Sequence, residues 1–184
     1  MKALLIIDMQ VGLFKPDNPR YDAEGVVQRI NTLSGYFRKN GDKVIFVQHD
    51  GTKEGEFIPG TQDWEILPSL TRMPSDMILR KTANDAFYKT ELEQMLHDDG
   101  IQEIAITGCA TDFCVNATIQ SGLNYDFRVF VIKDGHTTAD RPHLTAEQVI
   151  QHYNWRWENM IPTGGLIKVV SLDEYVKEAS CNII

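Results

Sequence analysis

The sequence is poor in cysteine and has no long apolar run. Its 184 residues include only Cys109, Cys114 and Cys181, an odd number that lacks the spacing of a disulfide framework or a zinc site. No apolar run approaches the ~20 residues that cross a membrane. The run that ends at Asp8 is too short for a signal peptide, and no cleavage site follows it. We therefore expect a cytoplasmic protein without a membrane partner.

Basic residues are scarce relative to acidic ones. The chain has 18 lysines and arginines against 26 aspartates and glutamates, which gives a net charge of −8. Because nucleic acids are polyanions, this balance argues against a nucleic-acid partner. Hydrophobic residues make up 42% of the chain, an ordinary share for a globular protein, and no repeat or linker divides it. Length and composition predict one domain over residues 1–184.

Apolar segments with two different periods alternate along the chain. Uninterrupted runs predict buried strands over residues 2–7, 43–49, 77–80, 104–107, 128–132 and 166–170. Helical spacing predicts helices over residues 22–40, 90–97, 115–123, 144–159 and 172–179, the second opened by a capping box of Thr90 and Glu93. This alternation predicts an α/β fold, with a mostly parallel sheet covered by helices on both faces. Residues 50–76 show no strong period, and a loop of this length is more often functional than idle.

Cys114 follows a predicted buried strand and stands at the opening of a predicted helix. The free N–H groups and the positive end of the helix dipole favour a thiolate there and can also bind an oxyanion. Taken alone, such a cysteine is more often a small buried apolar residue. The functional interpretation therefore depends on residues elsewhere in the chain.

Asp8 and Lys81 end two other predicted strands, so a parallel sheet would bring both to the edge where Cys114 lies. A cysteine nucleophile needs a base that takes its proton and returns it to the leaving group, and a carboxylate can do both. A nearby lysine can lower the pKa of the thiol. Considered singly, Asp8 could simply end a strand, and Lys81 could simply point into solvent. Together, the three residues predict a nucleophilic site.

Three segments resemble the isochorismatase-like cysteine hydrolases of the nicotinamidase/isochorismatase superfamily: LIIDMQ at 5–10, Lys81 followed by DAF at 85–87, and GCATDFCV at 108–115. The resemblance covers nearly the whole chain. It implies a three-layer, Rossmann-like fold with a parallel six-stranded sheet in the order 3-2-1-4-5-6. It also implies a catalytic triad of Asp8, Lys81 and Cys114, an oxyanion hole made by the N–H groups of Ala110 and Cys114, a cis Cys109–Ala110 peptide bond, and assembly into dimers or larger oligomers.

The same resemblance implies a reaction. Cys114 would attack a carbonyl or imine carbon while Asp8 passes the thiol proton to departing ammonia or amine, and water would then hydrolyse the thioester. Family members that act on isochorismate cleave a vinyl ether, and some of them lack the cysteine. Retention of Cys114 therefore favours the C–N bond of a small amide or related molecule. Isochorismatase-type ether cleavage and a non-catalytic binding or assembly protein remain the alternatives.

Nicotinamidases of this family bind a metal through an Asp-x-His after the second strand, whereas this sequence has Gln48-His49-Asp50 there. The five histidines show no ligand spacing either. We therefore expect no metal and no other cofactor, and a small molecule as substrate. His49 is better explained as a hydrogen-bonding residue at a strand end.

Four residues are candidates for the substrate pocket. Gln10 follows Asp8 at a spacing of two and would face the same site, and Phe14, Trp64 and Phe87 would supply an apolar wall. Phe14 and Phe87 are equally well explained as core or interface residues. Trp64 lies in the long polar loop, where an aromatic side chain is harder to explain by packing.

Overall fold

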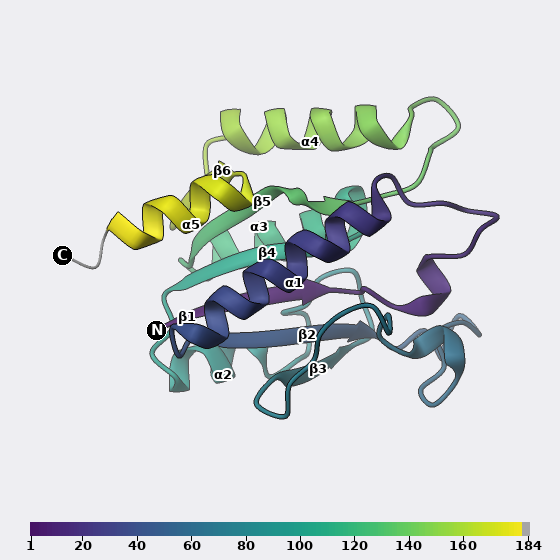
Figure 1. Cartoon of the computed structure of the whole chain (residues 1–184), viewed down its shortest axis with the longest axis horizontal. Coiled ribbons are helices and arrows are strands. Elements are labelled where there is room, and N and C mark those ends of the chain that lie inside the picture. Colours follow the sequence, from purple (N-terminus) through teal and green to yellow (C-terminus); the bar gives the residue numbers. More distant parts are fainter. Residues whose placement is uncertain (182–184) are drawn as a thin grey trace.

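The computed structural model describes residues 1–181, with side chains described up to residue 178, so the side chain of Cys181 lies outside this part. Six strands form one sheet in the order β3-β2-β1-β4-β5-β6 (Figure 1). They are β1 (Lys2–Ile7), β2 (Lys43–His49), β3 (Met77–Lys81), β4 (Glu103–Cys109), β5 (Arg128–Thr137) and β6 (Leu166–Val170). All neighbouring strands are parallel, which confirms the predicted sheet and its strand order.

Helices cover both faces of the sheet. α1 (Ala23–Lys39) and α5 (Leu172–Cys181) pack on one face, and α2 (Leu92–Asp98), α3 (Asn116–Asn124) and α4 (Ala146–Asn159) pack on the other (Figure 1). Successive side chains of a strand point to opposite faces. Leu5 and Ile7 therefore join the cluster under α2, α3 and α4, and Leu4 and Ile6 join the cluster under α1 and α5. All four are fully buried, which explains why β1 is apolar without alternation.

Two helix starts differ from the prediction. α2 begins at Leu92, and the Thr90 hydroxyl accepts a hydrogen bond from the Leu92 N–H at 3.3 Å, but Thr90 and Glu93 do not form the reciprocal pair of a capping box, so the capping box predicted there is wrong. A capping box is present at α4, where the Thr145 hydroxyl accepts a hydrogen bond from the Gln148 N–H and the Gln148 side chain accepts one from the Thr145 N–H. This pair satisfies two N–H groups that have no partner within the helix.

Two further differences lie near the carboxyl edge of the sheet. β5 continues to Thr137 instead of ending near residue 132, after a register shift against β4 between Ile106 and Gly108. α3 is preceded by one π-helical turn, Thr111–Val115, which contains Cys114. Cys114 therefore lies inside the π turn and does not open an α-helix, contrary to the prediction from the spacing of apolar residues. Single π turns recur at functional sites.

The long segment between β2 and β3 contains one short 3-10 helix, Gln62–Trp64. The side-chain amides of Gln10 and Gln48 donate hydrogen bonds to the carbonyl oxygen of Trp64, at 3.0 and 2.9 Å. These bonds fix the segment against the ends of β1 and β2.

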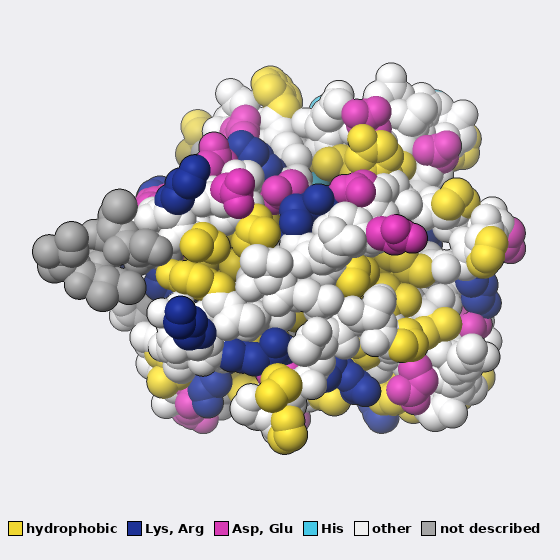
Figure 2. Space-filling view, viewed as in Figure 1, with side chains coloured by type: hydrophobic (Ala, Val, Ile, Leu, Met, Phe, Trp, Pro, Cys, Tyr) yellow, Lys and Arg dark blue, Asp and Glu magenta, His cyan; other side chains and the backbone are white. Residues whose placement is uncertain are grey.

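The face covered by α1 and α5 carries interspersed acidic and basic side chains, without a continuous basic patch (Figure 2). This face therefore has no field of one sign that would attract a polyanion. None of the described helices is both long and apolar enough to cross a membrane.

Candidate active site

The ends of β1 and β3 and the turn after β4 bring Asp8, Lys81 and Cys114 together. Lys81 Nζ lies 2.6 Å from Asp8 Oδ2 and 3.4 Å from Cys114 Sγ. It also donates a hydrogen bond to the Ala83 carbonyl oxygen at 2.9 Å. Asp8 and Lys81 are buried, and Cys114 is partly buried. Lys81 thus bridges the carboxylate and the sulfur in a site largely shielded from water.

The backbone beside these residues departs from ordinary strand geometry. Asp8 has a φ of 46°, in the left-handed region, and ends β1. Gly108 has a φ of 119°, and a Cβ at this position would lie 2.1 Å from the Ile7 carbonyl oxygen, so glycine is required. The peptide bond between Cys109 and Ala110 is cis, as the resemblance implies. The close approach of β4 to β1 therefore fixes the turn after β4 relative to Asp8.

Burial raises the pKa of the Cys114 thiol well above its ordinary value, and the Asp8 carboxylate raises it further. Lys81 lowers this pKa, but its effect is smaller than the other two together. Burial would lower the pKa of Lys81, yet the adjacent Asp8 carboxylate holds it above the usual value, so the ammonium stays charged. Burial and Asp8 therefore favour the thiol over the thiolate at Cys114, the opposite of the direction expected from a helix opening and a nearby lysine.

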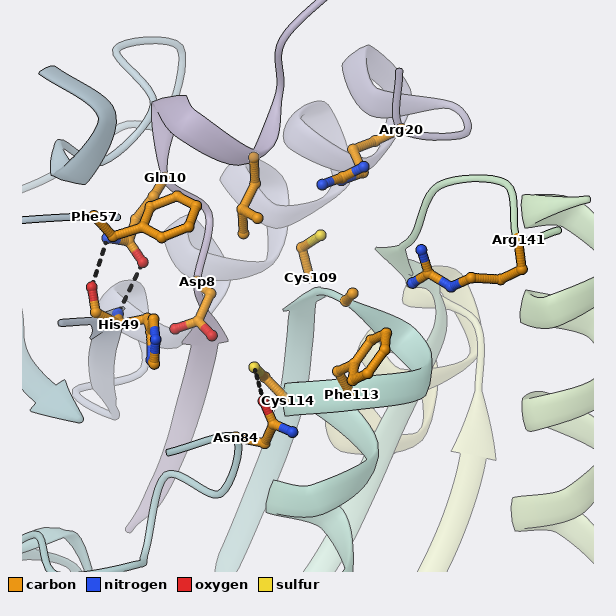
Figure 3. A pocket seen from close by; sticks show the side chains of 12 residues that line it. Asp8, Gln10, Arg20, His49, Phe57, Asn84, Cys109, Phe113, Cys114 and Arg141 are labelled. Carbon is orange, nitrogen blue, oxygen red and sulfur yellow. Dashed lines mark hydrogen bonds between the residues drawn. The ribbon is translucent and has the colours of Figure 1, made fainter. Parts of the chain in front are cut away.

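Two polar groups of residues that line the site have no protein partner. The Oδ1 atom of Asp8 is buried and accepts no hydrogen bond from any described residue, and the carboxylate points toward Cys114 across the pocket (Figure 3). The N–H of Ala110 likewise has no acceptor among the described residues. The Cys114 thiol donates instead to Asn84 Oδ1, at 3.5 Å. The residues that line the site thus supply one open acceptor, on Asp8, and one open donor, on Ala110.

A cavity of about 240 Å³ opens above Cys114. Its polar wall includes Arg20, His49, Asn84 and Arg141, and its aromatic wall is formed by Phe57 and Phe113 (Figure 3). Sequence reasoning identified none of these six as pocket residues. Asn84 and His49 carried a signal, because Asn84 follows Lys81 closely and His49 ends β2 at the edge of the sheet where Asp8 lies. The other four lie on loops or turns whose course the sequence does not reveal. The volume lies below the ~300–1,000 Å³ of pockets for drug-sized ligands, so it suits a small substrate.

Gln10 lines this cavity, as its spacing from Asp8 predicts, but its amide is already engaged. Gln10 Oε1 accepts a hydrogen bond from the His49 N–H at 2.8 Å, and Nε2 donates to the carbonyl oxygens of His49 and Trp64 at 3.1 and 3.0 Å. The polar atoms of Gln10 therefore bind the backbone of His49 and Trp64 and hold the end of β2 against the segment that follows it.

The three aromatic residues expected in the apolar wall lie elsewhere. Phe87 is 4% exposed and stacks on Phe127 in the core under α3, with ring centroids 5.8 Å apart. Phe14 lines a separate groove against α1. Trp64 is partly buried outside the cavity, and its ring lies 5.5 Å from the guanidinium of Arg80. Core packing explains Phe87, because apolar side chains are buried wherever the sheet and helices enclose them.

His136, at the extended end of β5, holds the π turn in place. Its Nε2 lies 3.0 Å from Asn154 Oδ1, an atom that can only accept, so Nε2 carries the proton. Its Nδ1 then accepts a hydrogen bond from the Thr111 hydroxyl, at 2.9 Å. The ring is 2% exposed, and burial lowers the pKa of His136 to about 4. A neutral imidazole therefore ties β5 and α4 to the turn that contains Cys114.

Among the described residues, no group of three or more histidines, cysteines or acidic residues could hold a metal ion. His49 lines the pocket alone, and its Nδ1 is buried without a hydrogen-bond partner in the described part of the chain. Burial and the charge of Lys81 lower the pKa of His49, so its ring is neutral at pH 7. The described donor set thus does not fit a metal centre.

The α/β fold, with an aspartate, a lysine and a cysteine at one edge of the sheet, is the arrangement expected of an isochorismatase-like hydrolase. The sequence comparisons agree with this class. The sequence model of the Isochorismatase domain matches residues 2–161, and the chain belongs to this family. It is 32% identical to a streptothricin hydrolase of Streptomyces noursei over 142 residues, which cover 77% of this chain and 56% of that protein. The chain thus spans little more than half of that relative's length.

Three further proteins match over larger shares of their own length. The ureidoacrylate amidohydrolase RutB of Caulobacter vibrioides is 33% identical, with 72% of this chain and 75% of that protein covered. The crystal structure of an isochorismatase family protein superposes with a TM-score of 0.83 at 32% identity, covering 92% of this chain and 98% of the other. An N-carbamoylsarcosine amidase of Thermoplasma acidophilum shares the fold, with a TM-score of 0.73 and 23% identity over 95% of this chain and 98% of that one.

Proposed function

We propose that this protein is a cysteine-dependent hydrolase that cleaves a C–N bond in a small amide or related molecule through a thioester. The observation that carries the proposal is the contact of Lys81 with both Asp8 and Cys114, with Asp8 Oδ1 left open beside the sulfur. A resting thiol needs a base at the moment of attack, and an open carboxylate oxygen in the same site fulfils that need.

In the first half of the reaction, Cys114 Sγ forms a bond to the carbonyl carbon as its proton moves to Asp8 Oδ1. The electron pair of the carbonyl moves onto oxygen, and the N–H groups of Ala110 and Cys114 stabilise this oxyanion. When the tetrahedral intermediate collapses, the C–N bond breaks and the nitrogen takes the proton from Asp8. Ammonia or an amine leaves, and a thioester remains on Cys114.

In the second half, Asp8 takes a proton from water, and the hydroxyl oxygen attacks the thioester carbon. The C–S bond then breaks, the acid product leaves, and the sulfur recovers its proton from Asp8. Lys81 stays charged throughout and stabilises the departing sulfur. Every proton that Asp8 takes is returned, so the enzyme ends in its starting state.

The relatives support a C–N bond as the target, because one of them is named an amidohydrolase. The other, streptothricin hydrolase, is also named as a hydrolase. The family also includes isochorismatases, so ether cleavage remains the second candidate. A non-catalytic protein has no need of an open base beside a partly buried thiol. Assembly into dimers or larger oligomers and a cytoplasmic location belong to the same proposal.

The test is a panel of small primary amides, ureides and isochorismate, assayed with the wild type and with Cys114→Ala. We expect ammonia or amine release by the wild type alone, and an acyl adduct on Cys114 in rapidly quenched intact-protein mass spectra. Turnover of isochorismate without any amide turnover would favour vinyl ether cleavage as the function. Amide hydrolysis that survives Cys114→Ala would overturn the cysteine mechanism.

A further inference from the structure

The charges around the cavity are paired with one exception. Lys81 pairs with Asp8 at 2.6 Å. The guanidinium of Arg141 forms a two-pronged pair with Asp112, Nε to Oδ2 at 2.7 Å and Nη2 to Oδ1 at 2.8 Å. Both pairs are neutral as units, so neither attracts an ion strongly into the cavity.

Arg20 is the exception. It forms no ion pair with a carboxylate among the described residues. Its Nη1 donates a hydrogen bond to the carbonyl oxygen of Asn18 at 3.2 Å, and its guanidinium interacts with Cys109, where it partly offsets the rise that burial causes in the pKa of that thiol. Its Nε is buried and has no acceptor in the described part of the chain. Arg20 lines the cavity, where its guanidinium extends over Cys109 from the side opposite His49 and Phe57 (Figure 3).

The net charge of the cavity follows from these groups. The two pairs cancel, His49 is neutral, and Arg20 leaves the cavity with one uncompensated positive charge. A buried donor without an acceptor is costly, and arginine binds planar carboxylates through several N–H groups. One positive charge matches a monoanion, whereas a phosphate dianion would leave a negative charge unpaired.

We infer that the substrate carries a carboxylate, which Arg20 binds while the scissile carbonyl lies above Cys114. The substrate class is therefore a small monoamide or ureide with a free carboxylate at its far end, of a size that fits the cavity of about 240 Å³. This inference rests on the proposed hydrolase function and narrows it. Arg20 is a specificity residue, and it takes no part in the movement of protons.

The test compares substrates that differ only in charge: glutaramate, uncharged pentanamide and cationic 5-aminopentanamide. Hydrogen bonds to charged groups are worth ~1.5–3 kcal/mol, so we expect kcat/KM for glutaramate to exceed that for pentanamide by about 10- to 100-fold. Arg20→Gln should remove most of this ratio, mainly through KM, and Arg20→Lys should restore part of it. The exposed Arg72 supplies the control, since Arg72→Gln should leave the ratio unchanged.

Binding of 5-oxohexanoate separates this inference from the proposed function, because this monoanion has a ketone in place of the amide of glutaramate and so has no C–N bond to cleave. Titration calorimetry with Cys114→Ser should detect 5-oxohexanoate binding, and the added Arg20→Gln change should abolish it. Arg20-dependent binding without turnover of any amide would uphold the carboxylate site and overturn the hydrolase. Amide hydrolysis without a charge preference, or 5-oxohexanoate binding that does not depend on Arg20, would overturn the carboxylate site alone. Absence of both binding and turnover would overturn both.

Discussion

The ammonium of Lys81 lies 2.6 Å from the carboxylate of Asp8, and the two side chains are only 0% and 2% exposed. Lys81→Met would leave Asp8 buried without its counter-charge. Breaking a buried ion pair from one side typically costs ~3–5 kcal/mol. We therefore expect a loss of stability of that order, measured from urea unfolding at pH 7, together with loss of turnover.

Lys15 offers a matched control, because it forms an ion pair with Asp63 at the same kind of distance, 2.7 Å, with both side chains about half exposed. Exposed pairs contribute little. Lys15→Met should leave the unfolding midpoint nearly unchanged. Equal losses in the two variants would show that burial does not govern the Lys81–Asp8 pair.

Asp8→Asn should have opposite effects on catalysis and on thiol reactivity. Asp8 raises the pKa of Cys114 while Lys81 lowers it. Removing the carboxylate leaves Lys81 to stabilise the thiolate, so alkylation by iodoacetamide at pH 7 should become faster. Turnover should fall by at least the ~10²-fold typical of a lost general base. Peptide mapping after timed alkylation measures the first effect, and steady-state rates measure the second.

Cys109 is the internal reference for that experiment. It is 0% exposed, and burial raises its pKa to about 12, so it should remain unlabelled in both proteins. Slower labelling of Cys114 in Asp8→Asn would mean that the carboxylate activates the resting thiol, contrary to the geometry described above.

His136 should make the protein less stable in mild acid. Its pKa is about 4 in the fold and ~6.5 in an unfolded chain, so between these values the unfolded state binds more protons. The stability is fully present above pH 6.5 and falls as the pH drops toward 4, by about 3 kcal/mol over the whole window. The midpoints of urea unfolding at pH 7 and pH 5 measure how steeply the stability depends on pH, and this dependence should be weaker in His136→Gln. His97→Gln, at an exposed position, should keep the wild-type slope.

Turnover should not require a metal. The sequence has no Asp-x-His after the second strand, and no described cluster offers three ligands. Activity should survive dialysis against a chelator, and added zinc, iron or manganese should not increase it. Loss of activity on dialysis that a divalent ion reverses would contradict this prediction.

The sheet could be predicted from the sequence because doubly covered parallel strands are apolar on both faces, as in β1 with Leu4, Leu5, Ile6 and Ile7. The shared edge of Asp8 and Lys81 followed, since the carboxyl ends of parallel strands coincide. The end of β5 was missed because Lys133 and Asp134 interrupt its apolar run, although pairing with β4 resumes beyond them.

The walls of the pocket and the charge state of the thiol could not be predicted. Arg20, Phe57 and Arg141 lie outside the strands and α-helices, where no hydrophobic period fixes the direction of a side chain. The pKa of Cys114 depends on how deeply the sulfur is buried and on its distances to two charges. Neither quantity has a counterpart in the spacing of residues along the chain.

Gly108 has a practical consequence for anyone who wishes to redesign this enzyme. Its Cα packs so closely on the Ile7 carbonyl that any side chain would push apart the segments bearing Asp8 and the turn after β4. Mutagenesis libraries should therefore hold this glycine constant and diversify Phe57 and Phe113, which line the cavity without supporting the sheet. Altered selectivity would then be sampled among clones that retain an intact reaction centre.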